Sequence, residues 1–108
     1  MDAMEDKILK YLGFASAGRS VATGTDLVLI AVRRGKAKLV LLSADASART
    51  AKQVTDKCAS YGVPLLHLAA DMEAVGRALG KKAAVAAAAV TDAGIADAIL
   101  ASAMENEK

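Results

Sequence analysis

The sequence predicts an α/β fold, a three-layer α/β/α sandwich built on a short mixed four-stranded sheet. Segments with apolar residues at helical spacing alternate with four short apolar runs. The last run, residues 83–90, is apolar at every position, which is typical of a strand covered by helices on both faces. With 108 residues and 55% hydrophobic composition, the chain is expected to form one domain, residues 1–108.

The first two expected elements are an amphipathic helix and a short strand. A helix is expected from residue 4 to about 17, because Ile8 and Leu12 belong to an apolar set at helical spacing, with charged residues on the other side. Gly18 interrupts this pattern, and residues 20–23 suit a short strand.

The second helix is expected at residues 25–34. Its unbroken apolar run could also indicate a strand, but Thr25 and Asp26 suit a helix N-terminus, where a side-chain oxygen accepts hydrogen bonds from unpaired backbone N–H groups. Gly35 suits the helix exit, so a helix is the better prediction. A buried strand at residues 38–43 follows.

The second half of the chain continues the alternation. The expected elements are a helix at 47–61, a strand at 65–68, a helix at 71–79, a strand at 83–90, and a helix from its cap at Asp92 to about residue 104. Gly62 and Pro64 end the first of these helices, and Gly80 ends the second.

The charge distribution favours a basic middle. The formal net charge is +2 and the pI is about 8.8, which permits a polyanionic partner without requiring one. Acidic residues concentrate near both ends, at Asp2, Glu5, Glu105 and Glu107. The middle is therefore more basic than the whole chain, which favours a nucleic-acid-binding face.

Cysteine content and hydropathy predict a cytoplasmic protein. Cys58 is the only cysteine, which excludes a disulfide framework or a CxxC metal site within one chain and suits a reducing compartment. No secretory leader is recognisable, and the apolar run at 83–90 is far shorter than a membrane span.

Residue types that often carry chemistry predict no enzyme, cofactor or metal site. The single histidine, His67, has no ligand partner at suitable spacing and is expected to be partly buried and hydrogen-bonded. Cys58 is expected to be a small core residue, because no activating base accompanies it. The glycines and lysines of residues 76–82 leave a helix instead of opening one, so Gly80 is better explained as a helix end than as part of a phosphate loop.

Four cations form the basic cluster of this chain: Arg33, Arg34, Lys36 and Lys38. They surround the turn between the second helix and the following strand, and two further turns are expected to lie near them. A solvated loop and a nucleic-acid contact both explain such a cluster. Since Phe14 and two tyrosines are the only aromatic residues, no platform for base stacking is expected, and any bound RNA would be read through its shape and backbone.

The order of motifs resembles a known family. The motifs are GTDLVLIAVRRGKAKLVLL at 24–42, SADAS at 43–47, GVP at 62–64 and VGRALGK at 75–81. From about residue 7 to 100 the chain resembles the ribosomal L-seven-A-e and L-thirty-e family of kink-turn RNA-binding proteins, and most of all its small bacterial YlxQ-like branch. The resemblance implies a non-enzymatic, monomeric α/β/α sandwich that binds structured RNA, such as rRNA or a kink-turn-like internal loop, and associates with the ribosome.

The resemblance also implies where RNA binds. In strong kink-turn binders the second helix begins G-x-N-E-x-x-K; here Gly24 is kept, while Asp26, Leu27 and Ile30 replace the Asn, Glu and Lys. Aspartate cannot donate as an amide does, and leucine and isoleucine form no side-chain hydrogen bonds. Kink-turn preference is therefore expected to be weakened.

Two further turns match the family's RNA-contacting positions. Ala44 and Asp45 take the place of a Glu-Asp pair beside the RNA, and Lys81, Lys82 and Ala83 match the loop that packs against a flipped-out nucleotide. The full set of expected RNA-binding residues is Gly24, Thr25, Asp26, Leu27, Ile30, Arg33, Lys36, Ala44, Asp45, Lys81, Lys82 and Ala83. Most of the affinity is expected from Arg33, Lys36, Lys81 and the backbone at Gly24 and Thr25.

A protein-interaction module is the alternative. If Leu27 and Ile30 are both exposed, they form an apolar patch that suits docking on ribosomal or transcription machinery. Burial of both would make them ordinary core residues.

Overall fold

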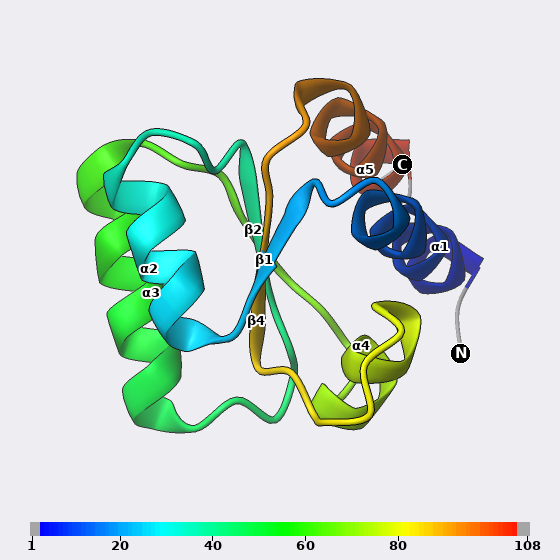
Figure 1. Ribbon diagram of the computed structural model, residues 1–108, viewed down its shortest axis with the longest axis horizontal. Helices are drawn as coiled ribbons and strands as arrows, with labels where there is room; N and C mark the ends of the chain where they lie inside the picture. The colour runs from blue at the N-terminus through cyan, green and yellow to red at the C-terminus, as the bar shows by residue number, and fades with distance from the viewer. Residues whose placement is uncertain (1–2, 106–108) are drawn as a thin grey trace.

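A computed structural model of the protein describes residues 3–105 and confirms the three-layer α/β/α sandwich (Figure 1). The elements, in chain order, are α1 (Ala3–Ala17), β1 (Val21–Thr23), α2 (Thr25–Arg33), β2 (Leu39–Leu42), α3 (Ala48–Tyr61), β3 (Leu65–His67), α4 (Met72–Ala78), β4 (Ala87–Val90) and α5 (Ala93–Glu105). Of the acidic residues expected near the chain ends, Asp2 and Glu107 lie outside the described residues.

The sheet is mixed, as predicted, with the strand order β1-β4-β2-β3. β4 pairs antiparallel with both β1 and β2, and β3 pairs parallel with β2. Because Leu39 pairs with Val90 and Leu42 pairs with Ala87, the end of β2 lies beside the start of β4. β1, β2 and β3 thus all finish where β4 begins. We call this the lower end of the sheet, after its place in Figure 1, and the opposite end the upper end.

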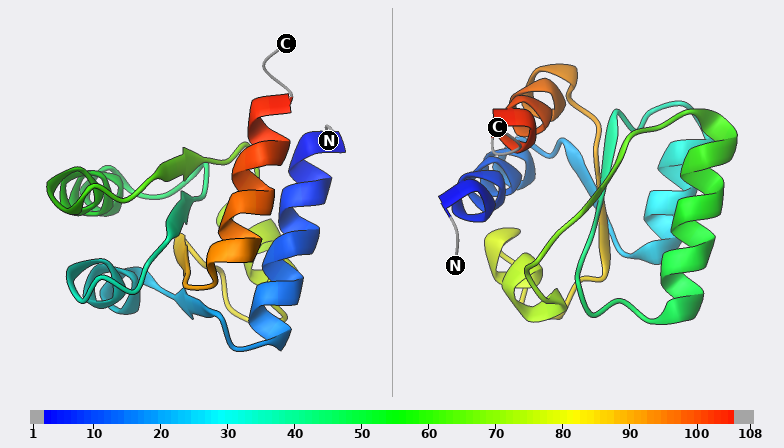
Figure 2. Two further views of the ribbon diagram at one scale, coloured as in Figure 1. Left: turned by 90° about the horizontal axis from the view of Figure 1, so that it is seen from above. Right: turned by 180° about the vertical axis from the view of Figure 1, so that it is seen from behind.

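Helices cover both faces of the sheet. α2 and α3 pack on one face, and α1, α4 and α5 lie on the other (Figures 1 and 2). Side chains alternate along β2 accordingly: Leu39 and Leu41 belong to the apolar cluster under α1, α4 and α5, whereas Val40 and Leu42 belong to the cluster under α2 and α3. Every residue of β2 and β4 is buried, which is the pattern expected of covered strands.

The last strand is shorter than predicted. β4 begins at Ala87, and the preceding residues form a loop after α4 in which Ala83 and Ala84 are exposed. The backbone N–H of Val85 donates to the carbonyl oxygen of Met72, 2.9 Å away, so this part of the apolar run bonds to α4 and not to a neighbouring strand. Alanine occurs in loops as well as in buried strands, so the apolar composition of residues 83–90 predicts a strand that is longer than the observed one.

The helix ends follow the predictions except at the start of α2. Asp92 caps α5, since its Oδ1 accepts from the backbone N–H of Ile95 at 2.9 Å. At α2, however, Gly24 is the N-cap, with φ 94° and ψ 149°, and no side chain caps the helix. The prediction that Thr25 or Asp26 caps α2 is therefore wrong, because the turn from β1 requires a backbone conformation that glycine adopts readily.

Two side-chain predictions have opposite outcomes. Cys58 is buried in the core as predicted, with 2% of its surface exposed, and this burial raises the pKa of its thiol. The prediction that His67 is partly buried is wrong: it is exposed, because it is the last residue of β3, which forms one edge of the sheet. Within residues 3–105, no helix is long and apolar enough to span a membrane.

Candidate nucleic-acid interface

The lower end of the sheet brings four turns together. Three backbone hydrogen bonds connect them: Gly24 N to Ala87 O at 3.0 Å, Ser43 N to Ala86 O at 2.9 Å, and Ala44 N to Ala70 O at 2.9 Å. They join the turn after β1 to the first residue of β4, the turn after β2 to the loop that precedes β4, and the turn after β2 to the turn after β3 (Figure 1). Ten of the twelve residues expected to bind RNA lie at this end or on the first six residues of α2, which starts there; they are Gly24, Thr25, Asp26, Leu27, Ile30, Ala44, Asp45, Lys81, Lys82 and Ala83.

The start of α2 offers unpaired backbone donors at this end. The first helical hydrogen bond runs from Val28 N to Gly24 O at 3.0 Å, so the three preceding N–H groups, at residues 25–27, have no helical partner. The helix dipole adds partial positive charge at the same place. Backbone donors and dipole together favour an anion such as a phosphate.

The substituted kink-turn positions differ in exposure. Asp26 is exposed, and Leu27 keeps 56% of its surface accessible, so both point away from the core. Ile30, one turn later, is half-buried. The condition for the protein-docking alternative is thus met fully at Leu27 and only partly at Ile30.

Asp45 has a structural role that the sequence did not reveal. Its Oδ1 accepts a hydrogen bond from the backbone N–H of Met72, the first residue of α4, at 2.8 Å. Asp71 caps the same helix through Ala74 N, also at 2.8 Å. Asp45 therefore fixes the turn after β2 against the start of α4. Contacts between residues this far apart in sequence leave no local signature.

The loop carrying Lys81, Lys82 and Ala83 is held against α4. Lys81 N donates to Gly76 O at 2.9 Å, and a Cβ placed on Gly76 would overlap the carbonyl oxygen of Ala83. Gly76 thus permits a close backbone approach, while Gly80, with φ 73°, ends the helix as predicted. The side chains of Lys81 and Lys82 are exposed, on the loop that leads to the start of β4.

The basic cluster lies at the upper end, away from these turns. Lys38 N donates to Val90 O at 2.8 Å, which places the cluster beside the end of β4. The expectation that the turns at Ala44–Asp45 and Lys81–Ala83 lie near this cluster is wrong. The cluster precedes the buried strand β2 and lies at its upper end, whereas these turns belong to the opposite, lower end of the sheet. Arg33 and Lys36 are exposed but do not join the other ten residues expected to bind RNA.

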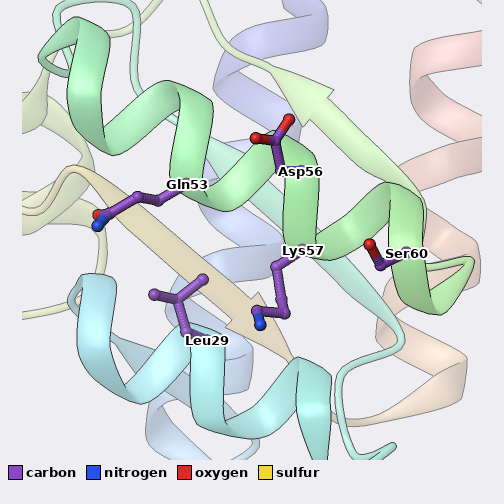
Figure 3. A pocket seen from close by; sticks show the side chains of 5 residues that line it. All are labelled: Leu29, Gln53, Asp56, Lys57 and Ser60. Carbon is purple, nitrogen blue, oxygen red and sulfur yellow. The ribbon is translucent and has the colours of Figure 1, made fainter.

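A shallow groove between α2 and α3 was not expected from the sequence. It has a volume of about 340 Å³ and is lined by Leu29, Gln53, Asp56, Lys57 and Ser60 (Figure 3). Lys52 Nζ lies 2.9 Å from Asp56 Oδ2, and this hydrogen bond raises the pKa of Lys52. Within the described part of the chain, no cluster of three His, Cys, Asp or Glu side chains could hold a metal ion.

Comparisons with known proteins agree with this architecture. The chain is 47% identical over 89 residues to the RNA-binding protein YlxQ of Bacillus subtilis (strain 168), covering 82% of this chain and 87% of the relative. It is 35% identical over 75 residues to the RNA-binding protein YlxQ of Enterococcus faecium, covering 69% and 72% of the two chains.

Two solved structures share the fold. A protein of unknown function from Bacillus halodurans superposes with a TM-score of 0.83 at 38% identity, covering 89% of this chain and 95% of its own. A 15.5kD RNA binding protein from Giardia lamblia has a TM-score of 0.85 at 22% identity, covering 97% and 91%, which shows similarity of fold alone. The family model described as "Ribosomal protein L7Ae/L30e/S12e/Gadd45 family" matches residues 6–100, and this chain belongs to that family.

Proposed function

We propose that this protein binds structured RNA through the lower end of its sheet and catalyses no reaction. The observation that carries the proposal is that uncapped backbone donors at residues 25–27 and the exposed cations Lys81 and Lys82 occupy one end of the fold. Membership of the family and the RNA-binding relatives support it. Ribosomal RNA and kink-turn-like internal loops are the substrates that this arrangement suits best.

The mode of binding follows from the chemistry of these groups. Backbone N–H groups and lysines contact phosphates, which position an RNA without reading its sequence. Asp26, Leu27 and Ile30 offer no side-chain donor to a base edge. We therefore propose that the protein recognises the shape of a bent RNA backbone and discriminates kink-turns less strongly than relatives with Asn, Glu and Lys at these positions.

A titration against three RNAs tests this function. The RNAs are a kink-turn, the same RNA with its G·A pairs replaced, and a plain duplex, each measured at low and at physiological salt. We expect binding to all three, with modest preference for the intact kink-turn and a strong dependence on salt. If the protein binds none of the three RNAs, the proposal is wrong.

The lysine loop provides a variant that localises the site. Replacing both Lys81 and Lys82 with alanine should weaken binding and reduce the salt slope by about two units of log K per log salt, one for each lost phosphate contact. Lys10→Ala, which removes one charge against the two of the loop variant, is the control for net charge, because Lys10 is exposed in the middle of α1. A loss in the control that is as large for each charge removed would mean that net charge, and not this loop, determines affinity.

The exposure of Leu27 favours one alternative, docking on a protein of the ribosomal or transcription machinery. Leu27→Asp distinguishes the two functions. Under the docking model it abolishes association with ribosomes even where no isolated RNA binds. Under the RNA model it changes affinity for the isolated RNA, because it adds negative charge beside the phosphates.

A further inference from the structure

The upper end of the sheet gathers five exposed cations from two separate segments. Ser20 O accepts from Thr91 N at 2.8 Å, and Lys38 N donates to Val90 O at 2.8 Å, so the turns before β1 and β2 flank the end of β4. Arg19, which precedes Ser20, thereby joins the basic cluster. β1 and β2 are separated by one strand, which places their backbones about 10 Å apart. We call Arg19, Arg33, Arg34, Lys36 and Lys38 the basic end; all five are exposed.

These cations have no carboxylate partners among the described residues. The ion pairs found there join Lys52 to Asp56 and Arg77 to Glu73, on α3 and α4. Asp92, in the turn after β4, uses its Oδ1 to cap α5. The positive charge of the basic end is therefore open to an external anion.

The negative ends of the helix dipoles balance only a small part of this positive charge. α2 and α3 both end at the upper end, as Figure 1 shows, and each contributes about half a negative charge there. Together they would be balanced by about one cation, whereas the basic end carries five. At the lower end, by contrast, Lys81, Lys82 and Arg49 share the surface with Asp26, Asp45 and Asp71. The five cations of the basic end thus lie at the end of the sheet opposite the turns that match the family's RNA-contacting positions.

The surface chemistry favours a nucleic-acid backbone over a protein. Between the cations the chain presents Gly35, and Ala37 is buried, so the basic cluster has no large apolar side chain to anchor a protein interface. Phosphates along a duplex need only spaced cations and hydrogen-bond donors. Arginine guanidinium groups, three of the five here, suit phosphate oxygens particularly well.

We propose that the basic end is a second RNA-binding surface that holds the backbone of a duplex segment while the lower end holds another segment. One protein molecule would then bridge two parts of a folded RNA. The bridging role rests on the proposed function of the lower end, but duplex binding by the basic end does not. Since β2 and the nine-residue α2 separate the two surfaces by about 14 Å, they contact different phosphates.

Duplex titration tests the surface itself. The upper variant combines Arg19→Gly, Arg34→Ala and Lys38→Ala; glycine suits the φ of 59° at position 19, so this variant should fold normally. Its affinity for a plain RNA duplex should fall at least 10-fold at low salt. The slope of log K against log salt should fall by about two to three units, because each lost phosphate contact removes roughly one unit. Lys10→Ala should leave both values near those of the unaltered protein. Unchanged duplex binding and slope in the upper variant would overturn the proposal.

A two-step capture assay tests the bridge. Kink-turn RNA is immobilised and loaded with protein, and a fluorescent duplex is then added. The unaltered protein should capture the duplex, and the upper variant should bind the immobilised RNA but capture none. The variant lacking Lys81 and Lys82 should bind duplex in solution and should be retained more weakly than the unaltered protein by the kink-turn RNA.

The outcomes separate the two proposals. If the protein fails to bind the kink-turn RNA but the upper variant still loses duplex affinity, the lower-end function fails and the second surface stands. If the duplex competes with the immobilised RNA for the protein, there is one surface and the inference is wrong. Mixing the upper variant with the lysine-loop variant should restore no capture; restoration would show that association between copies forms the bridge.

Discussion

At the start of α2, a single glycine replaces the side-chain caps that begin other helices of this chain. Ser47, Asp71 and Asp92 each accept a hydrogen bond from the first turn of their helix, whereas Gly24 cannot. The result is a helix start with free donors at the end of the sheet where we propose that RNA binds. A residue that would normally cap this helix would compete for those donors.

Replacing Gly24 tests whether its conformation is needed. A Cβ at this position would meet no atom within 4 Å, so Gly24→Ala introduces no clash, but the φ of 94° remains unfavourable for alanine. We expect the free energy of unfolding to fall by about 1–3 kcal/mol. Urea unfolding measures this change, with Gly18→Ala as the control, because Gly18 has ordinary φ and its nearest neighbour would lie at 3.6 Å. Equal stability of both variants would contradict the strain argument.

Asp45 separates a structural role from an RNA contact. Asp45→Ala removes the acceptor for Met72 N, and we expect unfolding to become easier by about 1 kcal/mol, as for other helix-start hydrogen bonds. Asp45→Asn keeps an oxygen at Oδ1 and should retain most of the stability. Because Asn also removes a negative charge from the proposed RNA face, its affinity for RNA should increase relative to the unaltered protein. A loss of affinity in the stable Asn variant would show that the carboxylate itself contacts the RNA.

At the scale of elements, the α4–β4 loop depends on close packing of two backbones. Gly76 lies against the carbonyl group of Ala83, and Lys81 N bonds to Gly76 O. The loop therefore presents its two lysines only while position 76 lacks a side chain. This pairing explains a glycine inside a seven-residue helix, where alanine would otherwise be favoured.

Gly76→Ala should displace the loop or strain the helix. We expect a loss of about 1–3 kcal/mol in the free energy of unfolding, which is the usual cost of overpacking, together with weaker RNA binding. Gly13→Ala is the helical comparison with a milder contact, since its Cβ would lie 3.2 Å from Ala78 O and needs a shift of only a few tenths of an ångström, whereas a Cβ at position 76 would overlap Ala83 O. If the two variants unfold at the same urea concentration, the contact between position 76 and Ala83 does not lower stability more than the contact at position 13.

Local sequence signals predicted the elements well because they are local in origin. Helical spacing, Asp92 and the glycines at 35, 62 and 80 placed the helices close to their observed bounds. The errors occurred where a partner distant in sequence decides the outcome. Val85 bonds to α4 instead of to a strand, and His67 is exposed because β3 is an edge strand.

At the scale of the whole molecule, the candidate site was only partly predictable. Motif resemblance identified the turns at Gly24, Ala44 and Lys81, and the topology brings these turns to one end. The interpretation of the basic cluster added Arg33 and Lys36, which the fold places at the other end. Residues before and after a strand lie at opposite ends of the sheet. Because β2 lies between Lys38 and Ser43, it separates Arg33 and Lys36, which precede it, from the turn at Ala44, which follows it.

The same separation predicts how salt affects the stability of the free protein. Arg19 approaches the basic cluster only in the folded state, so its repulsion from the other cations opposes folding. Unit charges about 10 Å apart in water repel by about 0.4 kcal/mol, and raising NaCl from about 0.01 M to about 0.15 M shortens the Debye length from about 30 Å to about 8 Å. Screening should therefore stabilise the unaltered protein at the upper end by several tenths of a kcal/mol.

The two charge variants should respond to salt differently, and urea unfolding at both ionic strengths measures this. The upper variant lacks Arg19, Arg34 and Lys38, so it should gain less stability from added NaCl than the unaltered protein gains. The lysine-loop variant loses cations that lie among carboxylates, so salt has fewer attractions to weaken there and its gain should be as large or larger. Comparing salt responses removes the separate effect of glycine at position 19, because backbone strain does not depend on ionic strength. Identical responses in all three proteins would mean that the cations of the basic end are too widely spaced to repel one another. Cations that far apart would not bind the backbone of one duplex together, which would contradict the proposed second surface.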